Sequence, residues 1–247
     1  MDKSTTDSVS DSTSPAALRR MTPRHGFQGD RAPRPIVPLV PPALTIAISR
    51  QAGARGTTIA HRAGRLLGWE VYDQELLEYI AQEGAFRQRV LDGLSSETAA
   101  WLEQRHTQLF STRKPARYPA VSDLARLILA LGAQGEVILV GRGAGSILPV
   151  DSTLHVRIVA PVADRIAYMS QSLRLTIDEA TQEVATRDRR RAEFIEGQFQ
   201  RQPSDVYQYD LVLNTGLLGE EISAEIIAQT ALAKNAARTR AHEARET

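Results

Sequence analysis

Five short apolar runs alternate with stretches of helical periodicity along most of this chain. The first run starts at Leu44, and the others cover residues 69–72, 136–141, 155–160 and 210–215. Each run has the length of a strand and is followed by apolar residues at helical spacing. Strands that alternate with helices form parallel sheets with right-handed crossovers. The pattern therefore predicts an α/β fold with a five-stranded parallel sheet.

Capping residues mark the ends of several predicted helices. Gly68 is a C-cap candidate for the helix that carries Ile59 and Leu66, and Asp73 can cap the next helix at its start. Thr176 and Glu179 form a capping box that opens a helix ending in the arginine-rich segment 187–191. Other helical patterns cover 95–110, 121–131, 162–173 and a stretch around 222–227, with a basic, proline-punctuated loop at 111–119.

The two ends of the chain differ in composition from the middle. Residues 1–43 are rich in Ser, Thr, Asp, Arg and Pro, which predicts a disordered tail and an extended linker. Met1 and Met21 both remain candidate start positions. The charged segment 235–247 is interpreted as a tail or a frayed helix. The predicted folded domain is therefore 44–234.

Overall composition excludes several classes of protein. The 247 residues are 42% hydrophobic and 24% charged, as in globular proteins that bury a core. A net charge of +1 gives no reason to expect a nucleic-acid or membrane partner. No apolar run approaches a membrane span, and the N-terminus lacks the order of a signal peptide. The chain has no cysteine, which fits a reducing cytoplasm, and its histidines show no metal-ligand spacing. The oligomeric state stays open.

A glycine-containing turn follows the first predicted strand and precedes a helix. Strand, turn and helix in this order bring backbone N–H groups and a helix N-terminus around one concavity, which suits phosphate. The P-loop pattern would need glycines near Arg50 and Arg55 and a lysine near Gly56. The candidate phosphate-binding residues are Arg50, Gly53, Ala54, Arg55, Gly56, Thr57 and Thr58.

Polar residues also stand at the ends of other predicted strands. Asp73, Arg142 and Asn214 come at or just after such ends, where parallel sheets bind their ligands. Each also has a structural interpretation, because Asp73 can be only a helix cap and Asn214 only a strand end. Arg142 is harder to explain structurally, since a cation flanked by glycines at a sheet edge has few structural uses.

Several segments together resemble the cytidylate kinase-like family of P-loop nucleoside monophosphate kinases. The glycine turn resembles that family's I-S-R-x-x-G-S-G-G-x-x-I-A segment, and the turn around Arg142 resembles its G-R-D-x-G turn. The similar segments, in the order of the chain, are 48–60, 70–77, 140–145, 187–191 and 209–215. The resemblance implies a three-layer P-loop kinase fold with a helical lid.

The resemblance also implies a reaction and roles for residues. The reaction is phosphoryl transfer from ATP to CMP or dCMP with Mg²⁺, catalysed by positioning and charge neutralisation. Turn 52–58 would wrap the donor phosphates, with Thr57 or Thr58 near Mg²⁺. Asp73 and Arg142 would position the acceptor. Arg187 and Arg191 would act from the lid, oriented by Asp188.

Two departures from the family leave an alternative open. The P-loop lysine is missing, so Arg50 or catalytic Arg55 would have to replace it, and Gly143 stands where the family has an aspartate. The segment 187–191 is also typical of a solvated helix face. A nucleotide-binding regulatory protein without turnover is therefore the alternative to a kinase.

Overall fold

Five parallel strands form one sheet in the computed structural model, which describes residues 41–111 and 119–246. The strands are β1 (Thr45–Arg50), β2 (Glu70–Tyr72), β3 (Val137–Val140), β4 (Thr153–Val159) and β5 (Leu211–Asn214). Their order in the sheet is β2-β3-β1-β4-β5, and every neighbouring pair is parallel. The predicted α/β fold with a five-stranded parallel sheet is confirmed.

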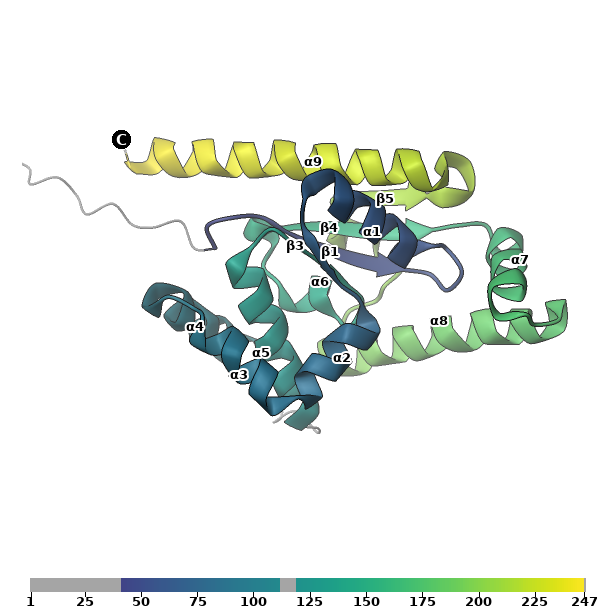
Figure 1. The fold of residues 1–247 in the computed structure, drawn as a ribbon, viewed down its shortest axis with the longest axis horizontal. Coiled ribbons are helices and arrows are strands. Elements are labelled where there is room, and N and C mark those ends of the chain that lie inside the picture. Colours follow the sequence, from purple (N-terminus) through teal and green to yellow (C-terminus); the bar gives the residue numbers. More distant parts are fainter. Residues whose placement is uncertain (1–40, 112–118, 247) are drawn as a thin grey trace, which may run out of the picture. The chain divides into compact units, whose positions relative to one another are not determined.

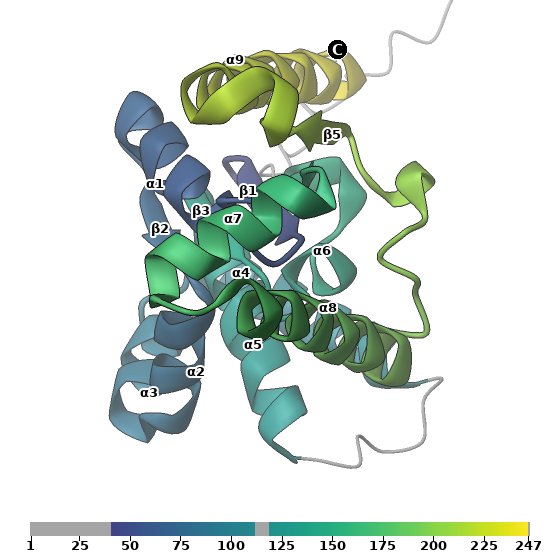
Figure 2. The same ribbon diagram turned by 90° about the vertical axis from the view of Figure 1, so that its right-hand side faces the viewer.

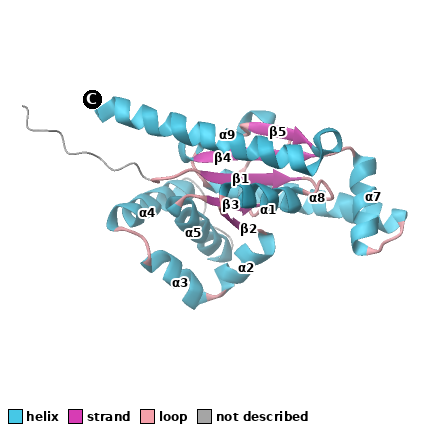
Figure 3. Ribbon diagram, turned by 45° about the horizontal axis from the view of Figure 1, so that its top comes forward, coloured by secondary structure: helices cyan, strands magenta, loops and turns pink. Residues whose placement is uncertain are grey.

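Helices cover both faces of this sheet (Figures 1 and 3). They are α1 (Gly56–Leu67), α2 (Gln74–Gln82), α3 (Gly84–Asp92), α4 (Ser96–Ser111), α5 (Pro119–Gln134), α6 (Ala144–Ile147), α7 (Val162–Leu173), α8 (Ile177–Phe199) and α9 (Thr215–Glu246). Helices α1 and α9 pack together on one face. Helices α2 to α5 lie on the other face (Figure 3), where they share one core with α6 and with Phe199 of α8. Short 3₁₀ turns occur at Val150–Ser152 and Val206–Gln208.

Side chains of the central strands alternate between two cores. Ile46 and Ile48 of β1 pack with α1 and α9, and Ala47 between them packs with α5 on the opposite face. All four residues of β3 are buried because both faces of the strand are covered. The last two residues of β1, Ser49 and Arg50, are only half-buried. The carboxyl end of β1 is therefore partly exposed, at the edge of the sheet where the candidate site lies.

Local capping chemistry places several helix ends as predicted. Gly68 ends α1 in the left-handed conformation with φ 73°. Asp73 caps α2, and its carboxylate accepts a hydrogen bond from the Leu76 N–H at 2.9 Å. Thr176 and Glu179 form the complete capping box at the start of α8. These contacts are local in sequence, so they depend little on the remaining fold.

Three helical segments differ from the sequence-based expectations. Helix α3 was not predicted, because residues 84–92 lack a clear apolar stripe. Helix α8 does not end within 187–191 but continues to Phe199, which is buried in the same core as residues of α5. The segment after Lys234 continues α9 as a helix through Glu246, and Arg238 there donates a hydrogen bond to the Pro41 carbonyl at 2.6 Å.

Some expectations fall outside the described residues. These are the tail over 1–40, the choice between Met1 and Met21, and most of the loop at 111–119. Within the described ranges, none of the helices combines the length and the apolar character needed to cross a membrane.

Candidate functional site

A pocket of about 650 Å³ opens at the carboxyl ends of β1, β3 and β4. The strand arrows in Figure 1 point toward α7, and Figure 2 shows this edge with α7 and α8 in front of the sheet. The pocket is lined by the end of β1, the start of α2, the turn after β3, the middle of α8 and the loop before β5. Segments far apart in the sequence therefore meet at the edge where parallel sheets bind ligands.

Arginine dominates the charged groups of this pocket. The lining contains four carboxylates, from Glu75, Glu183, Asp188 and Glu196. It contains six arginines, namely Arg50, Arg142, Arg157, Arg187, Arg190 and Arg191. This excess of positive charge in a partly enclosed space suits an anionic ligand, because guanidinium groups match the oxygens of phosphate and carboxylate.

The glycine turn between β1 and α1 is held tightly against α7. Gly53 has φ 77°, and a Cβ atom there would lie 2.5 Å from the carbonyl oxygen of Arg165. Only glycine fits such a conformation and such a contact without strain. Arg55 precedes α1 with φ 59°, although its side chain does not cap the helix. Residues 53–58 do not line the pocket, so the turn forms a separate region next to it.

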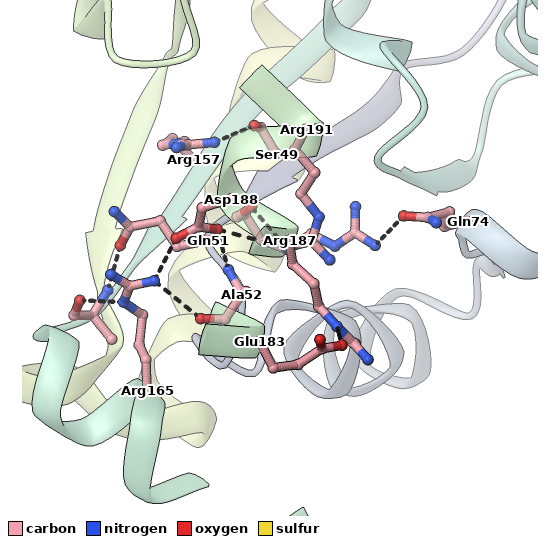
Figure 4. A network of polar contacts seen from close by, with 12 residues as sticks. Ser49, Gln51, Ala52, Gln74, Arg157, Arg165, Glu183, Arg187, Asp188 and Arg191 are labelled. Atoms are coloured by element: carbon pink, nitrogen blue, oxygen red, sulfur yellow. Dashed lines mark hydrogen bonds and ion pairs between the residues drawn. The ribbon is translucent and has the colours of Figure 1, made fainter. Parts of the chain in front are cut away.

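One backbone N–H of the turn binds a carboxylate of α8 (Figure 4). The Ala52 N–H donates to Asp188 Oδ1 at 2.7 Å, and Arg165 Nη1 donates to Asp188 Oδ2 at 2.6 Å. Arg165 also donates to the carbonyl oxygens of Ala52 and Ala160, at 3.2 and 3.1 Å. Asp188 was expected to orient the arginines of its own segment. In the structure it binds Arg165 of α7 and ties α8 to the turn, and its Oδ1 also lies 4.0 Å from Nη1 of Arg191 in its own segment.

Arg50 extends from the end of β1 into the pocket. A Cβ atom at Gly56 would lie 2.7 Å from its Cβ, and one at Gly141 would lie 2.0 Å from its Nη1. Its Nη2 donates to Gln74 Oε1 at 3.3 Å. Burial lowers the pKa of Arg50 to about 10, and the positive charge of Arg191 adds to this effect. The group stays charged at neutral pH, but the folded protein does not favour that charge.

Arg142 lies in the turn after β3, with φ 50° between two glycines of positive φ. Its guanidinium forms an ion pair with Glu78 and lies 5.8 Å from the ring centroid of Phe194. Its Nε atom is buried without a hydrogen-bond partner among the described residues, and burial lowers its pKa. Arg142 therefore lines the pocket from a strained backbone position, while its guanidinium is paired with Glu78.

The other predicted site residues divide into two groups. Arg187 and Arg191 line the pocket; Arg187 pairs with Glu183 at 2.6 Å, and Arg191 Nη1 lies 3.5 Å from the Arg50 carbonyl oxygen. Arg55 does not line it: its guanidinium stacks over Tyr168 at 5.0 Å and pairs with Glu220 at 3.5 Å. Asp73, Ala54, Gly56, Thr57 and Thr58 also lie outside the pocket lining.

Two arginines of the site were missed by sequence reasoning. Arg157 near the carboxyl end of β4 donates to Ser49 Oγ at 2.6 Å and lies 6.0 Å from the ring centroid of Tyr209. The rule that singled out Arg142, a cation near a strand end, would also have found Arg157. Arg165 is buried to 8% exposure in α7, and no sequence pattern distinguishes it from a surface arginine.

One family profile and one curated protein match this chain. A profile of the cytidylate kinase-like family matches residues 45–217. Uronate isomerase from Corynebacterium glutamicum is 32% identical over 105 residues, which are 42% of this chain and 20% of that protein. The chain therefore spans about a fifth of that relative.

Two solved structures are similar to this chain at low sequence identity. An uncharacterised protein from Eubacterium ventriosum has a TM-score of 0.54 at 16% identity, over 77% of this chain and 99% of that one. Shikimate kinase from Bacteroides thetaiotaomicron has a TM-score of 0.45 at 13% identity, over 76% and 97% of the two chains. The first of these similarities supports the fold alone.

Proposed function

Because the chain belongs to the cytidylate kinase-like family, we propose that it is an ATP-dependent nucleoside monophosphate kinase. It would transfer a phosphoryl group from ATP to CMP, dCMP or a related small acceptor in the cytoplasm. The observation that carries this proposal is the arginine-rich pocket beside the glycine turn, at the carboxyl edge of the sheet. Phosphoryl transfer needs mainly positioning and charge neutralisation, which such a pocket can supply.

The donor side of the site is assigned to the turn 52–58. Backbone N–H groups of the turn and of the first turn of α1 suit the phosphates of ATP. Thr57 and Thr58 offer hydroxyl groups for Mg²⁺, which in kinases takes most of its ligands from substrate phosphates and water. The described residues contain no group of three or more His, Cys, Asp or Glu side chains that would hold a metal alone. The ion would therefore bind together with the nucleotide.

The acceptor side is assigned to the pocket. Arg142 would bind the acceptor, and Arg187 and Arg191 would neutralise charge from α8 as the lid. Asp188 would act as a positioning residue, because it holds α8 against the turn through Ala52 and Arg165. Asp73 would contribute indirectly, since its carboxylate is engaged in capping α2.

A nucleotide-binding regulatory protein without turnover is the second candidate. Two observations favour it: Gly56 stands in place of the P-loop lysine, and the Ala52 N–H is already bound to Asp188. A protein of this kind would bind ATP and change the position of α8 without transferring a phosphoryl group.

A coupled assay with ATP, Mg²⁺ and a panel of nucleoside monophosphates separates the two candidates. We expect turnover with at least one pyrimidine monophosphate. Replacing Arg187 and Arg191 by alanine should then lower turnover roughly 100-fold. The matched control is Arg65→Ala, an exposed arginine of α1 outside the pocket. An absence of turnover in pure protein whose melting temperature still rises with ATP would support the regulatory candidate instead.

A further inference from the structure

Arg50 occupies space that two glycines leave free. Its stem passes over Gly56, where any side chain would collide with its Cβ and Cγ atoms, and its Nη1 lies against Gly141. In this chain, therefore, a cation at the end of β1 excludes a side chain at the first position of α1. The direction of Arg50 is set by this packing and does not depend on a charged partner.

The guanidinium of Arg50 has few partners for a half-buried cation. Among the described residues, it donates one side-chain hydrogen bond, to the neutral amide of Gln74, and no carboxylate there lies within ion-pair distance. A guanidinium has five N–H donors, so most of them remain available. Buried charges in folded proteins are usually paired, because an unpaired charge loses its hydration without compensation.

Two further cations lie beside Arg50. Arg142 follows Gly141 directly, and the guanidinium of Arg191 lies 3.5 Å from the Arg50 carbonyl oxygen. All three line the same pocket. Burial lowers the pKa of each of these groups, because a guanidinium removed from water loses part of its hydration. The pocket lining also contains more arginines than carboxylates.

We propose that Arg50, with Arg142 and Arg191, binds the phosphate dianion of the acceptor, and that Arg50 is not a donor-side replacement for the missing lysine. A phosphomonoester carries close to two negative charges at neutral pH and several acceptor oxygens, which suits guanidinium groups that line one pocket. Of the three, Arg142 is already paired with Glu78, and Arg191 donates to the Arg50 carbonyl oxygen. Arg50 faces the acceptor side because it lines the pocket with Gln74 and Arg142, whereas turn residues 53–58 do not line it. The identity of the acceptor rests on the proposed function, but the anion site does not.

The test measures binding to the full-length protein by calorimetry. The probes are CMP, ribose 5-phosphate, inorganic phosphate, cytidine and ATP with Mg²⁺. Arg50→Met should weaken the affinity for each phosphomonoester roughly 10- to 100-fold, the usual effect of losing hydrogen bonds to a charged group. It should leave the affinities for ATP and for cytidine unchanged. Arg50→Lys, which keeps the charge but loses the planar fork, should give an intermediate loss, and Arg65→Met should give none.

Thermal unfolding separates this site from a merely structural arginine. Removing a half-buried cation that has no carboxylate partner should raise the melting temperature of the ligand-free protein, whereas a structural role for Arg50 requires it to fall. A variant that binds phosphomonoesters as the unmodified protein does would overturn the proposal. So would an equal loss of ATP and CMP affinity, or an unmodified protein that binds none of the phosphate probes. If CMP binds in an Arg50-dependent way but is not phosphorylated, this inference is supported and the proposed kinase activity is refuted.

Discussion

Asp188 links α8 to the glycine turn, and its removal should destabilise the fold. Its carboxylate accepts the Ala52 N–H at 2.7 Å and a charged N–H of Arg165 at 2.6 Å. Asp188→Ala would leave the Arg165 guanidinium, with its side chain only 9% exposed, without its ionic partner. The main cost therefore falls on the buried arginine that remains.

The size of this effect follows from the burial of the two partners. Breaking a fully buried ion pair costs about 3–5 kcal/mol, and an exposed pair is worth about 0–1 kcal/mol. The Asp188 side chain is 29% exposed and Arg165 keeps two carbonyl partners, so the expected loss lies between these limits. We expect the free energy of unfolding to fall by about 2–3 kcal/mol. The melting temperature of a domain of this size should fall by about 4–12 °C.

Urea denaturation of three variants measures this loss. Asp188→Asn keeps the shape and an oxygen acceptor for Ala52 but removes the charge, so its cost should be intermediate. Glu193→Ala on the same helix is the control, since its contact with Arg189 at 3.9 Å is exposed and contributes less than about 0.5 kcal/mol. A loss below about 1 kcal/mol for Asp188→Ala would show that the link between α8 and the turn does not stabilise the fold.

Three further predictions concern single positions. Burial lowers the pKa of His155 to about 4, so the unfolded chain takes up a proton first as the pH falls. The free energy of unfolding should therefore drop by up to about 3 kcal/mol between pH 6.5 and 4, and His155→Leu should flatten this dependence in urea titrations at each pH. Gly53→Ala should destabilise the fold by more than about 3 kcal/mol in the same assay, because its Cβ would meet the Arg165 carbonyl at 2.5 Å. Gly68→Ala, with a similar φ of 73° but no atom within 4 Å, should cost only about 1 kcal/mol, and equal costs would contradict the steric argument. The Arg55→Ala variant should be less stable than the Arg55→Gly variant by about 1 kcal/mol. Both variants lose the same side-chain contacts, but only glycine adopts φ 59° without strain. Thermal unfolding of the two variants measures the difference.

Features that depend on neighbouring residues were predictable from the sequence alone. The five strands, the Asp73 cap, the capping box at Thr176 and the αL glycine at Gly68 are examples, and all are confirmed. Strand-end position also brought Arg50 and Arg142 to one edge, because parallel strands present their carboxyl ends together. The spacing of apolar residues and the hydrogen bonds of helix caps involve residues close together in the chain, so both can be recognised in a single sequence.

The directions of the charged side chains were decided only by the tertiary structure. Arg50 and Arg55 were equal candidates to replace a lysine, but one lies in the pocket and the other stacks on Tyr168 outside it. The partner of Asp188 is a backbone N–H 136 positions away, held in place by Arg165. A long charged side chain has many rotamers of similar energy in isolation, and packing against distant segments selects one of them.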